Sequence, residues 1–269
     1  MKTYKLRGYV SYFIFLFIAF SAAATLAAVP DQPDYLPRDG VIRLYGAGGP
    51  HTALIRAGKE YTLKTGIPVE VVFGPEKTWT DKARRNADII WGTSEQSMTA
   101  FMQTYKEFDS AEVEPLYIRR AVITVQKGNP KQIRGFDDLL KPGVRIVVTD
   151  GSGVSNTSGT GVWEDIAGRL GSLENVKALR KNIIAFATGS GASFKAFKEQ
   201  QADAWITWIH WPLTHPEDAD VVELPPELVI YRDFSVVTND KADDTARDFI
   251  AFLKGEEAYA IFKSEGWAK

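Results

Sequence analysis

A short strand, a glycine-rich turn and the start of a helix follow one another at four places in this chain. Runs rich in β-branched residues predict the strands, and apolar residues at helical spacing predict the helices. Such successive units are typical of an α/β fold with a mostly parallel sheet, in which ligands gather at the carboxyl ends of the strands. The four turns occupy residues 46–51, 92–96, 151–161 and 188–192.

Backbone N–H groups at a glycine-rich turn and a helix start form a positive end that suits an anion. A fully ionised oxyanion only accepts hydrogen bonds, so amide and hydroxyl donors match it. The alternative for each turn is a surface loop with ordinary helix caps. The predicted ligand-binding positions in the turns are Gly48, Gly49, His51, Thr93, Ser94, Ser152, Ser155, Asn156, Thr157, Ser158 and Ser190.

A ligand with two anionic ends also needs a cation nearby. Lys77 and Arg120 are the positions that we predict for this role, and Arg119 and Lys195 lie beside the same turns or crossing. For each of these four residues, the alternative is a solvated surface side chain.

Composition excludes several classes of protein. The 269 residues carry a formal net charge of -2 and no basic cluster, which argues against a nucleic-acid partner. The absence of cysteine excludes disulfides, a lipid-modified cysteine, a zinc-thiolate site and a thiol nucleophile. We expect no metal or cofactor. The three tryptophans at 205, 208 and 211 lie near His210 and His215, and we interpret them as aromatic packing with the histidines at the surface, since partners at metal-ligand spacing are missing.

The first 28 residues have the order of a secretory signal. Lys2, Lys5 and Arg7 precede an apolar run at 10–20, and small residues follow up to Ala28. We predict cleavage after Ala28 and a periplasmic protein with no further membrane contact. The alternative is an uncleaved membrane anchor, because the apolar run is nearly long enough to span a bilayer.

Two long extended runs, 116–126 and 228–237, exceed what one short strand needs. We interpret them as crossings between two lobes. This predicts a discontinuous first lobe from 38–120 and 231–269, and a second lobe from 121–230. An amphipathic helix is expected over 245–263 at the end of the chain.

Particular motifs resemble the periplasmic solute-binding proteins of the sulfate- and molybdate-binding type. The stretch 122–130, Val-Ile-Thr-Val-Gln-Lys-Gly-Asn-Pro, looks like their hinge strand and turn, and 246–267 looks like their closing helices. Three further stretches look like the accessory colonization factor AcfC family. They are Tyr-Gly-Ala-Gly-Gly-Pro-His ending at 51, Phe-Gly-Pro-Glu-Lys-Thr-Trp-Thr at 73–80, and 152–165.

The resemblance implies a two-lobed type II periplasmic binding protein fold, each lobe a mostly parallel sheet flanked by helices, with the two crossing strands as hinge. It implies capture of a sulfate-like oxyanion or a small phosphorylated or carboxylated metabolite between the lobes, and delivery to an ABC permease. An exported adhesin or colonization antigen with the same fold is the alternative, and a homodimer stays open. No complete phosphate-loop or nucleophile-elbow motif occurs, so we expect no hydrolase, transferase or other enzyme.

Overall fold

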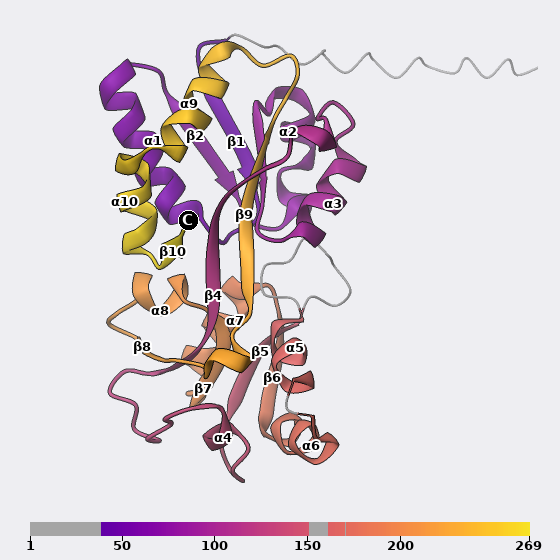
Figure 1. The fold of residues 1–269 in the computed structure, drawn as a ribbon, viewed down its shortest axis with the longest axis vertical. Coiled ribbons are helices and arrows are strands. Elements are labelled where there is room, and N and C mark those ends of the chain that lie inside the picture. Colours follow the sequence, from indigo (N-terminus) through magenta and orange to yellow (C-terminus); the bar gives the residue numbers. More distant parts are fainter. Residues whose placement is uncertain (1–38, 151–160, 170) are drawn as a thin grey trace, which may run out of the picture. The chain divides into compact units, whose positions relative to one another are not determined.

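The computed structural model describes residues 39–150, 161–169 and 171–269, which form an α/β fold (Figure 1). Within these ranges, ten strands make one mixed sheet in the order β2-β1-β3-β9-β4-β7-β5-β6, with β8 and β10 paired to β4. The strands are β1 (Ile42–Gly46), β2 (Val69–Phe73), β3 (Ile89–Gly92), β4 (Glu114–Gln126), β5 (Ile146–Asp150), β6 (Ile183–Thr188), β7 (Ala204–Trp208), β8 (Ala219–Val222), β9 (Tyr231–Thr238) and β10 (Trp267–Ala268).

Parallel pairs form both ends of this order, and antiparallel pairs form its middle. Strand β1 is parallel to β2 and β3, and β5 is parallel to β6 and β7. The long strand β4 runs antiparallel to β9 on one side and to β7 on the other, and the pairing of β4 with β9 is visible in Figure 1. The long extended run expected over 116–126 is therefore confirmed as a strand that both parts of the sheet share.

Helices follow most of the strands, as the repeated units predict, and short 3₁₀ turns join several of them. Helix α1 packs along β2, and helices α9 and α10 pack against each other and against α1. The helices are α1 (His51–Thr65), α2 (Thr80–Asn86), α3 (Glu95–Thr104), α4 (Phe136–Leu139), α5 (Val162–Gly168), α6 (Leu173–Asn182), α7 (Ser190–Glu199), α8 (His210–Thr214), α9 (Asp244–Lys254) and α10 (Glu256–Ser264), with 3₁₀ turns η1 (Glu76–Thr78), η2 (Ser110–Glu112) and η3 (Pro226–Leu228).

Two local predictions are wrong. The single helix expected over 245–263 is two helices, because Gly255 takes an extended backbone with φ -73° and ψ 163° between them. The Thr-x-x-Gln pattern at 93–96 predicts a capping box with Thr93 as the N-cap, but the observed capping box starts one residue later. Ser94 is the N-cap, and its side chain accepts a hydrogen bond from the backbone N–H of Ser97.

The buried hydrophobic side chains fall into clusters that follow the chain. One large cluster takes all its members from 121–230, and a second takes its members from 42–117 and 234–267. Two smaller clusters repeat this division. Among the described residues, no cluster mixes the segment 121–230 with the rest of the chain.

Gly46, the last residue of β1, allows a close approach of β3. A Cβ atom at this position would lie 2.4 Å from both the indole ring and the carbonyl oxygen of Trp91. We expect Gly46→Ala to lower the free energy of unfolding by about 3 kcal/mol, because Trp91 is fully buried and cannot move aside. Urea denaturation measures this change, and Gly48→Ala is the matched control because its added Cβ would meet no atom within 4 Å. A Gly46→Ala protein as stable as the control would contradict the packing described.

Candidate functional site

Two of the predicted turns meet at the carboxyl ends of neighbouring strands. Strands β1 and β3 are parallel, with Gly46 in register with Trp91, so the turns that leave them start side by side. The indole N–H of Trp91 donates to the carbonyl oxygen of Ala47 at 2.8 Å and fixes the first turn against β3. A Cβ atom on Gly49 would lie 2.9 Å from Cγ2 of Thr93. The structure therefore brings Gly49 and Thr93, two of the predicted positions, together.

A buried cation lies behind these turns. The Arg119 side chain projects from β4 and is 1% exposed. Its Nη2 donates to the carbonyl oxygen of Thr93 at 3.4 Å, and its Nη1 would lie 2.6 Å from a Cβ atom on Gly49. Burial lowers the pKa of Arg119 to about 9, an effect that the Asp233 carboxylate partly offsets. Since this value is still above neutrality, the guanidinium carries its positive charge at pH 7.

Aromatic rings and a histidine surround the guanidinium. Its central carbon lies 4.6 Å from the ring centre of Trp208 and 5.2 Å from that of Trp267, which are cation–π distances. His210, the first residue of α8, places Nδ1 3.5 Å from Nη1 of Arg119 and stacks on Trp267. These contacts hold the guanidinium plane in one orientation.

Several donors around Arg119 are buried and have no hydrogen-bond partner among the described residues. Because Arg119 can only donate, Nδ1 of His210 accepts in this contact and the ring proton is on Nε2. A buried donor without an acceptor costs about 1–3 kcal/mol, so such donors favour a ligand that accepts hydrogen bonds. The atoms concerned are Oγ1 of Thr93, Nε2 of His210, Nε1 of Trp208 and Nε1 of Trp267.

His51 closes the first turn at the start of α1. Its Nδ1 lies 2.6 Å from the carbonyl oxygen of Gly48, and its ring stacks on Phe73 with 4.0 Å between the ring centres. Burial lowers the pKa of His51, so the ring is neutral at pH 7. The predicted positions Gly48 and His51 thus lie together in one turn beside Gly49.

The other predicted positions are distributed differently. Ser94 caps α3 directly after Thr93, whereas Lys77 is exposed in η1. Arg120 points away from Arg119 and forms an ion pair with Glu223 at 2.7 Å. Ser190 is buried at the start of α7. The positions Ser152, Ser155, Asn156, Thr157 and Ser158 lie outside the described residues.

The sequence predicts Arg120 as a cation of the site and gives Arg119 only as a residue beside the same crossing. It indicates no role in the site for His210. The expectation of a surface histidine is wrong for His210, which is 3% exposed, whereas the expected aromatic packing is confirmed by the contact of Trp205 with Trp211. Side chains alternate between the two faces of a strand, so Arg119 lies on the same face of β4 as Tyr117. This alternation is the sequence pattern that could have indicated a buried Arg119. That signal is weak, since β4 is apolar on both faces.

The neutral, buried His210 makes folding stability depend on pH. Burial lowers its pKa well below the ordinary value, and the positive charge of Arg119 acts in the same direction. The His210 imidazole therefore binds a proton near pH 6.5 in the unfolded chain but stays neutral in the folded chain. The free energy of unfolding therefore falls as the pH drops below that value. We expect His210 to account for a loss of about 1.4 kcal/mol between about pH 7.5 and pH 5.5.

Urea denaturation at both pH values measures this loss, and His210→Gln serves as the reference because it does not titrate. The difference in unfolding free energy between the two proteins should shrink or reverse at the lower pH. A difference that is the same at both values would show that His210 is protonated in the folded chain.

No cluster of acidic or histidine side chains within the described ranges has the arrangement of a metal site. The same part of the chain contains no helix that is both long and apolar enough to cross a membrane.

Comparison with known proteins adds a family model and solved relatives. Residues 42–268 match the family model described as bacterial extracellular solute-binding protein. PEB3 from Campylobacter jejuni is 46% identical, with a TM-score of 0.80 over 85% of this chain and 99% of PEB3. A second crystal structure is of L-phospholactate-bound PEB3, which is 47% identical with a TM-score of 0.81.

Similarity to sulfate-binding proteins is more distant. The sulfate-binding protein of Salmonella typhimurium is 33% identical over 104 residues, which are 34% of this chain and 30% of that protein. The chain thus matches less than a third of that relative's length. The sulfate-binding protein SubI from Mycobacterium tuberculosis is 17% identical with a TM-score of 0.67, and it shares the fold. These neighbours confirm the predicted type II periplasmic binding protein fold.

Proposed function

This chain belongs to the bacterial extracellular solute-binding protein family, and we propose that it captures a small anion at Gly49, Thr93 and Arg119. The observation that carries this proposal is the buried, charged guanidinium directly behind the turn at the start of α1. A positive helix end and a fixed cation add their fields at the same point.

The donors favour a ligand that is fully ionised and compact. Within the described ranges, the N–H groups of His210 and Trp208 and the O–H group of Thr93 have no partner, and all three can donate to a ligand that accepts hydrogen bonds. Each hydrogen bond to a charged ligand contributes about 1.5–3 kcal/mol, so a few of them reach micromolar affinity. Sulfate, molybdate and small phosphorylated or carboxylated metabolites have this chemistry, and the names of the relatives support the same class.

The second half of the proposed site is the turn from 151 to 160 together with Ser190. We propose two lobes, 38–120 with 231–269 and 121–230, that close on the anion about β4 and β9. The division of the buried clusters supports this arrangement. Binding would stabilise the closed state by its greater affinity for the anion.

The cellular role in this proposal is periplasmic capture for an ABC importer, without catalysis. The relatives are solute-binding proteins, and the sequence order of residues 1–28 is that of a signal peptide. The motifs at 45–51, 73–80 and 152–165 support a place in the AcfC-like branch.

A thermal-shift panel tests the anion class. Purified protein is heated with sulfate, molybdate, phosphate, 3-phosphoglycerate or citrate, and with chloride at equal ionic strength as the control. A ligand at about 100 times its Kd stabilises the folded chain by about 2.7 kcal/mol, which raises Tm by roughly 5–10 °C for a chain of this size. If no anion raises Tm above the chloride control, the proposed function is wrong.

A further inference from the structure

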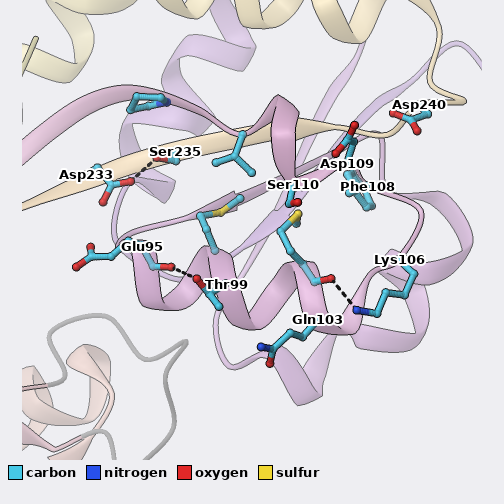
Figure 2. Close-up of a pocket in the computed structure, with 14 residues that line it drawn as sticks. Glu95, Thr99, Gln103, Lys106, Phe108, Asp109, Ser110, Asp233, Ser235 and Asp240 are labelled. Carbon is cyan, nitrogen blue, oxygen red and sulfur yellow. Dashed lines mark hydrogen bonds between the residues drawn. The ribbon is translucent and has the colours of Figure 1, made fainter.

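A groove of about 940 Å³ runs along α3, bordered by the segment that contains η2 and by β9 (Figure 2). We call it the α3 groove. Its volume lies within the range of natural ligand sites. None of the described residues assigned to the anion site lines it.

Apolar side chains form the floor of the α3 groove. Met98 and Phe108 are each 4% exposed, and Met102, Val113 and Pro115 extend the same surface. Met98 and Met102 are one helical turn apart on α3. Methionine is flexible and polarisable, and it is common on surfaces that accept partner segments of varied shape.

The rim of the groove carries an excess of negative charge. Among the lining residues that the structure describes, one is a cation, Lys106, and four are carboxylates: Glu95, Asp109, Asp233 and Asp240. The described part of the chain provides no ion pair for any of these four carboxylates, and Lys106 donates to the carbonyl oxygen of Met102 at 3.3 Å.

Two of the carboxylates are also held in place. The backbone N–H of Ala111 donates to Asp109 at 2.8 Å, and the Ser235 hydroxyl donates to Asp233. Figure 2 shows Glu95 and Asp233 toward one end of the groove and Lys106, Asp109 and Asp240 toward the other. Negative charge is therefore present at both ends of the apolar floor.

We propose that the α3 groove binds a segment of a partner protein in which lysine or arginine residues alternate with aliphatic ones. Aliphatic side chains would bury the methionine floor from water, and the basic side chains would pair with the rim carboxylates. Complementary charge of this kind gives a docking surface its specificity and its rate of association. The volume and the apolar floor distinguish this surface from a solvated acidic face.

The groove is connected to the anion site through two elements. Glu95 directly follows the Thr93–Ser94 turn, and Asp233 on β9 is in register with Ile118, the neighbour of Arg119 on β4. The Asp233 charge acts on the Arg119 guanidinium. A basic segment would screen the rim carboxylates that repel a bound anion, so docking and anion binding should strengthen each other. This coupling, unlike the docking itself, rests on the proposed function.

The methionine content of the chain gives a direct readout. The three methionines are Met1, Met98 and Met102, and two of them form the groove floor. We would label the methionine methyl groups with ¹³C and titrate the purified protein with a short capped peptide of alternating arginine and leucine. The control peptide replaces arginine by glutamate. We expect the basic peptide, and not the acidic one, to shift the Met98 and Met102 signals.

The combined variant Glu95→Gln, Asp240→Asn removes two rim charges that no described hydrogen bond or ion pair of their side chains requires. We expect it to weaken the peptide about tenfold, or 1.4 kcal/mol. The matched control Glu60→Gln, Glu217→Gln changes net charge equally at exposed positions that do not line the groove. This control should bind the peptide as wild type does.

Four results would overturn the proposal. The first is that the peptide shifts the signal of neither Met98 nor Met102. The second is that both double variants lose affinity for the peptide equally. The third is that spermine produces the same shifts at the same concentration, which would show that the peptide is not needed. Methionine shifts that appear on raising protein concentration alone would indicate a second copy of the chain and would also contradict it. The thermal-shift panel tests the anion site independently of the peptide titration. A negative result for the α3 groove therefore does not contradict the proposed anion site.

Discussion

Replacing Arg119 by glutamine is expected to weaken anion binding by at least about 100-fold, or roughly 3 kcal/mol. The guanidinium is the fully buried cation beside Gly49 and Thr93, and its charge acts at short range in surroundings that solvent does not screen. Glutamine keeps most of the side-chain length and hydrogen-bonding capacity but removes the charge. Isothermal titration calorimetry with the strongest anion of the thermal-shift panel measures the effect.

Arg120→Gln is the matched control, because it removes an arginine from the next position of the same strand. Arg120 is paired with Glu223 at the surface, and we expect its replacement to change anion affinity by less than about threefold. Circular dichroism and a cooperative thermal transition establish that each variant is folded. Arg119→Lys provides a second test if Arg119→Gln does not fold, since it keeps the charge without the planar fork. Equal losses for Arg119→Gln and Arg120→Gln would show that Arg119 has no special role.

Gly49→Ala is expected to reduce anion affinity about tenfold or more, through sterics rather than charge. The added methyl group would lie 2.6 Å from Nη1 of Arg119 and 2.9 Å from Cγ2 of Thr93. Both side chains are buried, so the guanidinium must leave the position in which Trp208 and Trp267 hold it. We also expect a loss of stability of about 1–3 kcal/mol from overpacking.

Gly48→Ala separates this effect from a general change in the turn. It adds the same methyl group one residue earlier, where no atom of a described residue other than its chain neighbours lies within 4 Å. Calorimetry should find near wild-type affinity for Gly48→Ala and a clear loss for Gly49→Ala. If both variants bind the anion equally well, the ligand does not occupy the space in front of Gly49 and Arg119.

Most elements of the fold were predictable because their signals are local. The stop of α1 at Gly66, which has a left-handed φ of 77°, follows from glycine's freedom at a helix end. The errors were local as well: the division of the last helix at Gly255 and the one-residue shift of the α3 cap to Ser94. At α3, Thr93 and Ser94 are both residue types that favour an N-cap, so the local pattern does not decide between them.

The candidate site was less predictable because its parts are far apart in the chain. The glycine and hydroxyl turns were found by their composition, and the structure places Gly49 against Thr93. The choice between Arg119 and Arg120 depends on which face of β4 is turned toward α1, and both faces of that strand are apolar. His210 and Trp267 approach Arg119 from α8 and β10, which no local pattern indicates.

The sequence by itself determined the order of strands, turns and helices, the donor-rich turns and the resemblance to a family of anion-binding proteins. These depend on periodicity, glycine placement and motif identity, which are read along the chain. The tertiary structure alone decided that Arg119 is the buried cation, that His210 is neutral beside it, and that α3 carries an acidic groove. Burial and electrostatic contact are set by residues brought together from distant parts of the chain, and a linear pattern does not contain those distances.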